Sequence, residues 1–102
     1  MSMTFGDSRY DWDENKNQSN IRKHGVSFEE ATDVFDDDMV VLIPDDEHSY
    51  EEERFIAIGF SHKNRILPVC YCERHSQEIT RIISARPANN TEKILYRGGF
   101  QA

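Results

Sequence analysis

The sequence predicts an α+β fold with an antiparallel sheet of about four strands, two helices before it and one helix after it. Segments with helix-capping signals lie near both ends of the chain, whereas short apolar segments of strand length lie between them. Short turns separate the apolar segments, and such turns favour antiparallel pairing of neighbouring strands. We predict one domain over residues 1–102, because a chain of 102 residues can bury one modest core.

The N-terminal part of the chain carries a short strand and a well-delimited helix. Residues 1–8 are small and polar, and we expect them to be frayed. Residues 9–12 fit a short first strand. Asp13 can cap a helix that runs to about His24, and Gly25 follows as its C-terminal stop.

A second helix is predicted directly after the first. Ser27 is its N-cap, with Glu30 at the capping-box position and Val26 before the cap as a hydrophobic staple. Four residues form its apolar stripe: Phe28, Ala31, Val34 and Phe35. The stripe predicts that one side of this helix packs against the sheet.

Apolar segments of strand length make up the middle of the chain. They span residues 39–43, 54–60 and 66–73, and an acidic loop over 45–53 separates the first two. The segment 54–60 is apolar on both faces, which predicts a central and covered strand. Pro68 lies inside the third segment, so we expect a bulge or an edge position there.

The last part of the chain is predicted as a strand followed by a short helix. The strand begins near Ile79, and Pro87 ends it because proline cannot donate a hydrogen bond to a ladder. Asn89 opens the helix, and Glu92 follows three residues later in the capping-box spacing. Gly98 is a suitable stop for this helix.

Two arginines at the end of this strand form the candidate ligand site. Arg81 lies on the strand, Arg86 lies just beyond it, and Tyr96 ends the helix that follows. Forked guanidinium donors with a hydroxyl nearby can hold a phosphate group. Because 81 and 86 differ by an odd number, a regular strand would point them to opposite faces. Both can join one site only if the strand ends or bulges between them.

The charges divide the chain into an acidic half and a basic half. The net charge of −7 argues against a general nucleic-acid binder. Residues 1–53 hold 16 Asp and Glu against 4 Lys and Arg, whereas residues 54–102 hold 3 against 8. The basic half is therefore the candidate for an anionic ligand. The alternative is that the acidic residues only keep the surface solvated.

Several classes of protein are not indicated by the sequence. No apolar run reaches the roughly 18 residues of a membrane span, and no secretory signal is recognisable, so a cytoplasmic protein is expected. Cys70 and Cys72 would share one face of a strand, a poor arrangement for a disulfide, and reduced thiols are expected. Residues 45–48 could chelate a hard cation, but acidic loops are usually solvated, and we predict no metal or cofactor.

The remaining polar residues are suited to cleaving RNA without a metal ion. The ribose 2′-OH is the nucleophile, so the protein need only assist its deprotonation, stabilise the phosphorane and protonate the leaving oxygen. Glu53 is a candidate base because Arg54 and Lys23 could set its pKa. Lys23, His24 or Tyr96 could serve as the acid. The alternative is that these residues form ordinary surface ion pairs and core contacts.

Six segments carry a family resemblance. They are Tyr10–Lys16 (Y-D-W-D-E-N-K), Asn20–Ala31 (N-I-R-K-H-G-V-S-F-E-E-A), Val34–Asp36, Asp45–Ser49 (D-D-E-H-S), Glu52–Ser61 (E-E-R-F-I-A-I-G-F-S) and Arg81–Tyr96. The runs K-H-G-V-S-F-E-E-A and R-I-I-S-A-R-P-A are the most specific. In these segments the chain resembles the BrnT-type toxins of bacterial type II toxin–antitoxin systems, over nearly its whole length.

The resemblance implies a RelE-like fold and a metal-independent ribonuclease activity that arrests translation. It also implies a BrnA-type antitoxin with a ribbon-helix-helix DNA-binding part, so that operator DNA is bound only through the complex. By motif position, the implied functional residues are Lys23, His24, Glu53, Arg54, Arg81, Arg86 and Tyr96.

The chain departs from the family pattern in two ways. Asn89 and Asn90 stand where similar sequences usually carry threonine and a basic residue. The whole chain is acidic, whereas RelE-like toxins that act on ribosomes tend to be basic. A toxin ribonuclease is the leading hypothesis. The rivals are a partner-binding protein without activity and a metal-dependent hydrolase that uses Asp45–His48.

Overall fold

The computed structural model describes residues 2–5, 8–48, 52–74 and 78–98. Its elements in chain order are β1 (Ser2–Phe5), β2 (Ser8–Asp11), α1 (Glu14–His24), α2 (Phe28–Ala31), the 3₁₀ helix η1 (Thr32–Asp36), β3 (Val41–Pro44), the 3₁₀ helix η2 (Asp46–His48), β4 (Phe55–Phe60), β5 (Ile66–Arg74), β6 (Ile79–Ala85) and α3 (Asn90–Tyr96). This arrangement confirms the predicted α+β class.

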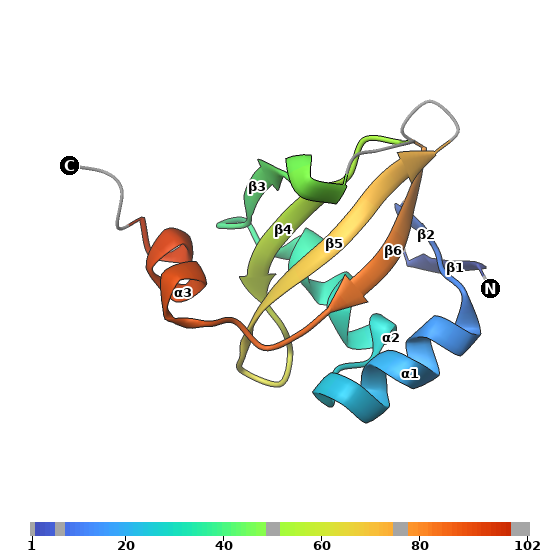
Figure 1. The fold of residues 1–102 in the computed structure, drawn as a ribbon, viewed down its shortest axis with the longest axis horizontal. Helices are drawn as coiled ribbons and strands as arrows, with labels where there is room; N and C mark the ends of the chain where they lie inside the picture. Colours follow the sequence, from blue (N-terminus) through green and yellow to red (C-terminus); the bar gives the residue numbers. More distant parts are fainter. Residues whose placement is uncertain (1, 6–7, 49–51, 75–77, 99–102) are drawn as a thin grey trace.

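The sheet has six strands in the order β1-β2-β6-β5-β4-β3 (Figure 1). Neighbouring strands are antiparallel except β2 and β6, which pair in parallel with Asp11 opposite Arg81. The predicted antiparallel meander is present as β3 to β6, but the predicted number of strands was too low, and the parallel pairing of β2 with β6 was not predicted. Two short N-terminal strands extend the sheet, and β1 pairs with β2 although residues 1–8 were expected to be frayed. A hairpin partner gives β1 ladder hydrogen bonds that an isolated end lacks.

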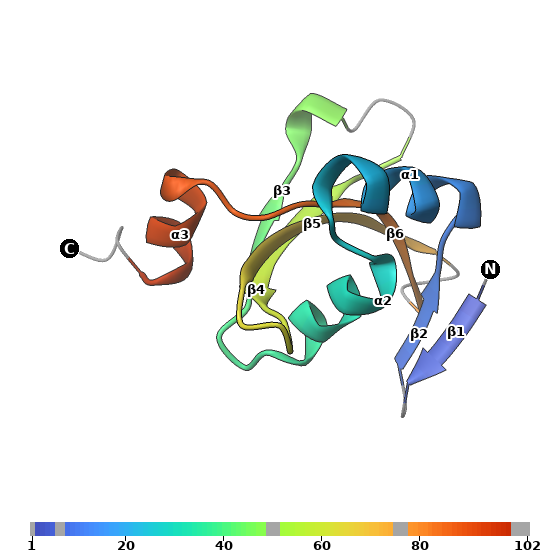
Figure 2. The same ribbon diagram turned by 90° about the horizontal axis from the view of Figure 1, so that it is seen from below.

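One face of the sheet is covered by α1, α2 and η1, and α3 lies at the opposite end of the molecule from β1 and β2 (Figures 1 and 2). The core fills the space between the first three helices and this face. Its fully buried side chains include Trp12, Phe28, Val34, Leu67 and Ile82. The other face of the sheet, which we call the open face, carries the alternate residues of the same strands.

Local capping signals place the first two helices as the sequence predicted. The Asp13 carboxylate accepts a hydrogen bond from the Asn15 N–H at 2.8 Å, and Gly25 closes α1 with a left-handed φ of 68°. Glycine adopts such a φ without the steric cost that a Cβ atom would bring. The Asn20 amide donates to the Ala85 carbonyl at 2.7 Å, so α1 is fixed directly to β6.

The capping box predicted for α2 forms only in part. The Ser27 hydroxyl accepts from the Glu30 N–H at 3.0 Å, as expected for an N-cap. The Glu30 side chain does not return to the cap. It is buried and accepts from the Arg65 guanidinium at 2.5 and 2.7 Å and from the Ser61 hydroxyl at 2.6 Å. The charged guanidinium of Arg65, the residue before β5, binds the Glu30 carboxylate more strongly than the neutral backbone N–H of the cap would.

The expectation of a bulge or an edge position at Pro68 was also wrong. Pro68 lies in β5, between β4 and β6, and it pairs with Ile58 of β4. Its carbonyl accepts from the Arg86 N–H at 3.4 Å, just beyond the last residue of β6. In a strand the N–H and C=O of one residue point to the same side. The missing N–H of Pro68 therefore faces a position where the β6 ladder has already ended.

None of the helices in the described part of the chain is long and apolar enough to span a membrane. Cys70 and Cys72 are free thiols.

Candidate functional site

A bulge in β6 brings both arginines of the last strand to the open face. Cys70 is opposite Ser84 and Tyr71 is opposite Ile82, so Ile83 is an extra residue in β6. An extra residue reverses the alternation of side chains beyond it. Arg81 and Arg86 therefore share one face although their numbers differ by five, because Ile82 and Ala85 both point into the core.

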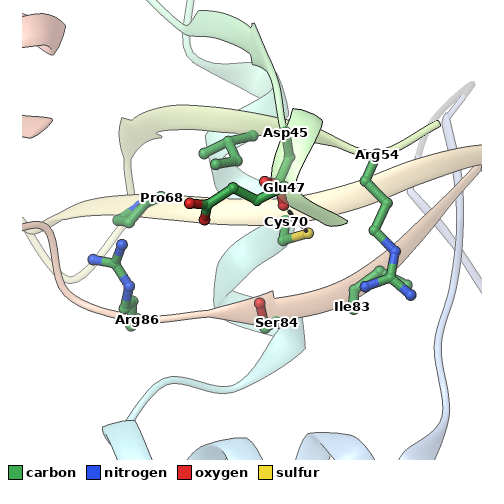
Figure 3. A pocket seen from close by; sticks show the side chains of 9 residues that line it. Asp45, Glu47, Arg54, Pro68, Cys70, Ile83, Ser84 and Arg86 are labelled. Atoms are coloured by element: carbon green, nitrogen blue, oxygen red, sulfur yellow. Dashed lines mark hydrogen bonds between the residues drawn. The ribbon is translucent and has the colours of Figure 1, made fainter. Parts of the chain in front are cut away.

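The open face carries a pocket of about 360 Å³. Nine residues line it: Asp45, Glu47, Arg54, Ile56, Pro68, Cys70, Ile83, Ser84 and Arg86. Figure 3 shows Arg86 at one end and Arg54 at the other, with the Ser84 hydroxyl between them and the Glu47 carboxylate reaching toward Arg86. Two cations, one hydroxyl and two carboxylates thus line a single pocket.

Arg86 is fixed by a bidentate ion pair with Glu92 of α3. Its Nη1 and Nη2 donate to Glu92 Oε1 and Oε2, both at 2.7 Å. These hydrogen bonds raise the pKa of Arg86. Burial alone would raise the pKa of Glu92, but the hydrogen bonds from Arg86 and from the Asn89 N–H outweigh burial and lower it. The guanidinium is charged and oriented, and its side chain is still 43% exposed.

Glu92 also forms the predicted capping box with Asn89. The Asn89 N–H donates to Glu92 Oε1 at 2.9 Å, and the Glu92 N–H donates to Asn89 Oδ1 at 2.9 Å. One carboxylate therefore caps α3 and orients Arg86. The start of the helix and the position of the guanidinium are coupled through this residue.

Two further arginines of the open face, Arg81 and Arg54, also have acidic neighbours. Arg81 Nη1 donates to Asp11 Oδ2 at 2.8 Å, which follows from the parallel pairing of β2 with β6. Arg54 Nη2 lies 4.0 Å from Glu52 Oε1. These three arginines are thus partly neutralised before any ligand binds, and a phosphate bound to them would have to compete with a carboxylate.

Asp45 and Glu47 contribute two carboxylates with different surroundings. Asp45 is buried and accepts a hydrogen bond from the Cys70 thiol at 3.6 Å. Burial raises the pKa of Cys70 to about 11, so this thiol stays protonated at neutral pH. Glu47 is exposed to the pocket. Among the described residues, no three His, Cys, Asp or Glu side chains are grouped to hold a metal ion.

The remaining predicted site residues lie outside this pocket. Lys23 and His24 are exposed on the last turn of α1, which packs on the other face of the sheet. Glu53 is exposed just before β4. The Tyr96 hydroxyl donates to Asp37 Oδ2 at 2.5 Å, and burial together with this hydrogen bond raises its pKa to about 12. Of the seven predicted residues, only Arg54 and Arg86 line the pocket, and Arg81 shares their face.

Sequence reasoning missed the acidic partners. Asp11, Asp37 and Glu92 accept hydrogen bonds from predicted residues, and the first two lie far from their partners in the sequence. Glu47, which the sequence offered only as a possible cation ligand, lines the pocket. The capping-box spacing pointed to Glu92 as a helix cap, but nothing in the spacing indicated its second role beside Arg86.

The fold and the site define a small α+β protein with an arginine-lined pocket on the open face of a mixed sheet. The family model described as "Ribonuclease toxin, BrnT, of type II toxin-antitoxin system" matches residues 12–92. This chain therefore belongs to the BrnT family of ribonuclease toxins, as the six sequence segments indicated.

A solved structure agrees with this assignment. The crystal structure of the Brucella abortus ribonuclease toxin, BrnT, matches with a TM-score of 0.60 and 30% sequence identity. The match covers 78% of this chain and 94% of that one. No curated protein matches the chain in a sequence search. As a member of a type II toxin–antitoxin family, the chain has an antitoxin as its expected partner.

Proposed function

We propose that this chain is a metal-independent endoribonuclease that inhibits translation by cleaving RNA. The convergence of Arg54 and Arg86 on one pocket supports this proposal, since permanent forked donors suit the transferring phosphate. The 2′-OH attacks the adjacent phosphorus, and the 5′-oxygen leaves with a proton from a general acid. In this mechanism Arg86 holds the phosphorane charge and Arg54 holds a neighbouring phosphate.

The base is best assigned to a carboxylate that lines the pocket. Glu47 reaches toward Arg86 within the hollow, whereas Glu53 is exposed outside it. We therefore propose Glu47 as the residue that takes the 2′-OH proton, and Glu53, Lys23, His24 and Tyr96 stay predictions from the family resemblance. Arg81 is proposed to extend the phosphate-binding surface along β6, after exchange of its Asp11 partner.

The proposed partner is a BrnA-type antitoxin with a ribbon-helix-helix part, so that operator DNA is reached only through the complex. The proposed location is the cytoplasm, where translation, the proposed target process, takes place.

A second function, binding of the antitoxin without catalysis, is favoured by one observation. Arg81 and Arg86 are both already paired with carboxylates of the same chain. If Glu92 never releases Arg86, the pocket cannot hold a phosphate, and the chain would act only within a repressor complex.

The first experiment incubates the purified chain with total RNA in EDTA, beside Arg86→Ala. We expect cleavage by the wild type and a loss of about 10²–10³-fold in the variant, as for removal of one transition-state donor. Arg22→Ala is the matched control, because Arg22 is an exposed cation on α1. A thermal melt of each protein separates lost chemistry from lost folding.

The outcomes distinguish the candidate functions. Cleavage that stops in EDTA would favour a metal-dependent hydrolase. Equal cleavage by wild type and Arg86→Ala would remove Arg86 from the site. Intact RNA with all proteins, repeated with translating ribosomes, would favour the binding function.

A further inference from the structure

A second pocket lies on the open face, beside α3. Its volume is about 240 Å³, and eight residues line it: Phe60, Asn64, Arg65, Ile66, Pro87, Ala88, Lys93 and Arg97. Three of the eight are cations, and no carboxylate is among them. In a chain with a net charge of −7, a pocket of this composition is suited to an anion.

The cations of this pocket differ from those near Arg86 in how they are paired. Arg65 is neutralised by buried Glu30. Lys93 and Arg97 are exposed, and neither side chain has a hydrogen bond or ion pair with any residue that the structure describes. Lys93 lies on α3 and Arg97 is its C-cap residue, four positions on, whose N–H donates to the Lys93 carbonyl at 3.1 Å. Their side chains therefore lie on one side of the helix end. An anion placed there has no carboxylate of the described residues to displace.

The second pocket lies next to the first. Pro87 and Ala88 follow Arg86 in the chain, and the Ala88 N–H donates to the Ile66 carbonyl at 2.9 Å. Pro68 lines the first pocket and Ile66 lines the second, and these alternate residues of β5 share the open face. Two extended residues span about 7 Å. A single strand of RNA bound at Arg86 therefore reaches the second pocket within a few nucleotides.

The pocket also offers a surface for a base. Phe60 is 39% exposed, and its ring packs against that of Tyr96 with centroids 5.9 Å apart. An exposed aromatic ring beside basic side chains is the usual arrangement for holding unpaired bases and their backbone. Asn64, at the turn between β4 and β5, adds an amide that can contact a base edge or a phosphate.

We propose that Lys93, Arg97 and Phe60 form a second RNA-binding subsite, which holds the phosphate backbone and one base of the substrate next to the cleaved bond. This inference rests on the proposed ribonuclease function. The subsite takes single-stranded RNA and contributes to substrate binding, while the chemical step takes place at Arg86. The two pockets together fix the direction in which the strand crosses the open face.

The test measures binding of a single-stranded RNA whose 2′ positions are methylated, so that the strand cannot be cleaved. Fluorescence anisotropy compares the wild type with the double variant Lys93→Ala/Arg97→Ala. We expect a loss of affinity on the order of 10-fold, as two phosphate contacts are removed. The matched control is Lys16→Ala/Arg22→Ala, which removes two exposed charges from α1 on the other face of the sheet and should leave the affinity unchanged.

A second measurement keeps binding and catalysis apart. With cleavable RNA, the Lys93→Ala/Arg97→Ala variant should raise KM about 10-fold and leave kcat nearly unchanged, because the removed contacts bind ground state and transition state alike. Phe60→Leu, which keeps an apolar side chain, should weaken binding of RNA more than binding of an abasic strand of equal charge.

The proposal is overturned if the double variant binds methylated RNA as tightly as the wild type. If that variant keeps its affinity for RNA but loses affinity for the antitoxin, the pocket binds protein instead. Cleavage by the wild type with unchanged RNA affinity in the variant would refute the subsite and leave the ribonuclease function standing. No RNA binding and no cleavage by the wild type would refute both.

Discussion

Glu30 illustrates how one buried carboxylate can hold distant segments together. It is 1% exposed, and it joins α2 to Arg65 and Ser61, which flank the turn between β4 and β5. Arg65 also donates to the Gly25 carbonyl at 2.7 Å, so the end of α1 belongs to the same network. A buried charge is tolerated only when it is paired in this way.

We predict that Glu30→Gln destabilises the protein by about 2–3 kcal/mol at pH 7. Burial alone would raise the pKa of Glu30, but the hydrogen bonds from Arg65 and Ser61 outweigh it and lower the pKa. The charged pair therefore stabilises the fold above the unfolded pKa, and this contribution disappears as pH falls through the folded pKa. Urea titrations should show that the difference in the free energy of unfolding between wild type and variant becomes smaller below about pH 4.5.

The exposed Glu78 provides the control for this prediction. Glu78→Gln should change the free energy of unfolding by less than about 0.5 kcal/mol at either pH. A Glu30→Gln variant that is as stable as the wild type at pH 7 would show that the ion pair contributes nothing net.

At the scale of single residues, the sequence could identify caps but not partners. Asp13, Ser27 and Asn89 were placed correctly because a cap depends on residues within one turn. The pairing of Tyr96 with Asp37 depends on how the chain folds back over 59 residues, and no local pattern encodes it. The same holds for Arg81 with Asp11.

At the scale of elements, β6 determines the site. The sequence showed that Arg81 and Arg86 can share a face only if the strand ends or bulges between them, and the extra residue Ile83 provides the bulge. A bulge has no sequence signal here, because neither glycine nor proline marks it. The pairing of β2 with β6 was missed for a related reason, since parallel neighbours can be far apart in the chain.

The element α3 is held to the sheet by few contacts. It contains no fully buried residue, and its main described links are Arg86 with Glu92, the Tyr96 hydroxyl with Asp37, and the Tyr96 ring with Phe60. A helix of seven residues is not stable without such contacts. The position of Glu92, and with it the orientation of Arg86, depends on this attachment.

We therefore predict that Tyr96→Phe loosens α3 selectively. Loss of the hydrogen bond to Asp37 should cost roughly 1–2 kcal/mol of local stability. Hydrogen exchange of the α3 amides should become about 5- to 30-fold faster, while the amides of β4 to β6 keep their protection.

The control for this prediction keeps the Tyr96 hydroxyl and alters an exposed side chain of the same helix. Ile94 is 56% exposed, and Ile94→Leu should leave the exchange rates of α3 unchanged. Uniformly faster exchange throughout Tyr96→Phe would show that α3 unfolds together with the sheet.

At the scale of the whole molecule, the pairing of charges determines how many cations are available to a ligand, more than the net charge does. The acidic first half supplies Asp11 and Glu52 to arginines of the basic second half, so part of the charge division seen in the sequence is cancelled within the fold. The open face therefore carries fewer available cations than the sequence suggests. Only the structure reveals which cations have no carboxylate partner among the described residues.

The pairing of arginines with carboxylates predicts how strongly salt weakens the binding of RNA. A phosphate that displaces a carboxylate from an arginine releases no net counterion, because the freed carboxylate attracts cations in its turn. Only Lys93 and Arg97 should then contribute to the salt dependence of binding to single-stranded RNA. We expect log K to fall with log[salt] with a slope of about −1.4, whereas five free cations would give about −3.5. In Lys93→Ala/Arg97→Ala the slope should approach zero, and Lys16→Ala/Arg22→Ala should retain the wild-type value. A steep wild-type slope would instead mean that Arg54, Arg81 and Arg86 are released from their carboxylates before RNA arrives, with Glu92 already turned away from the pocket.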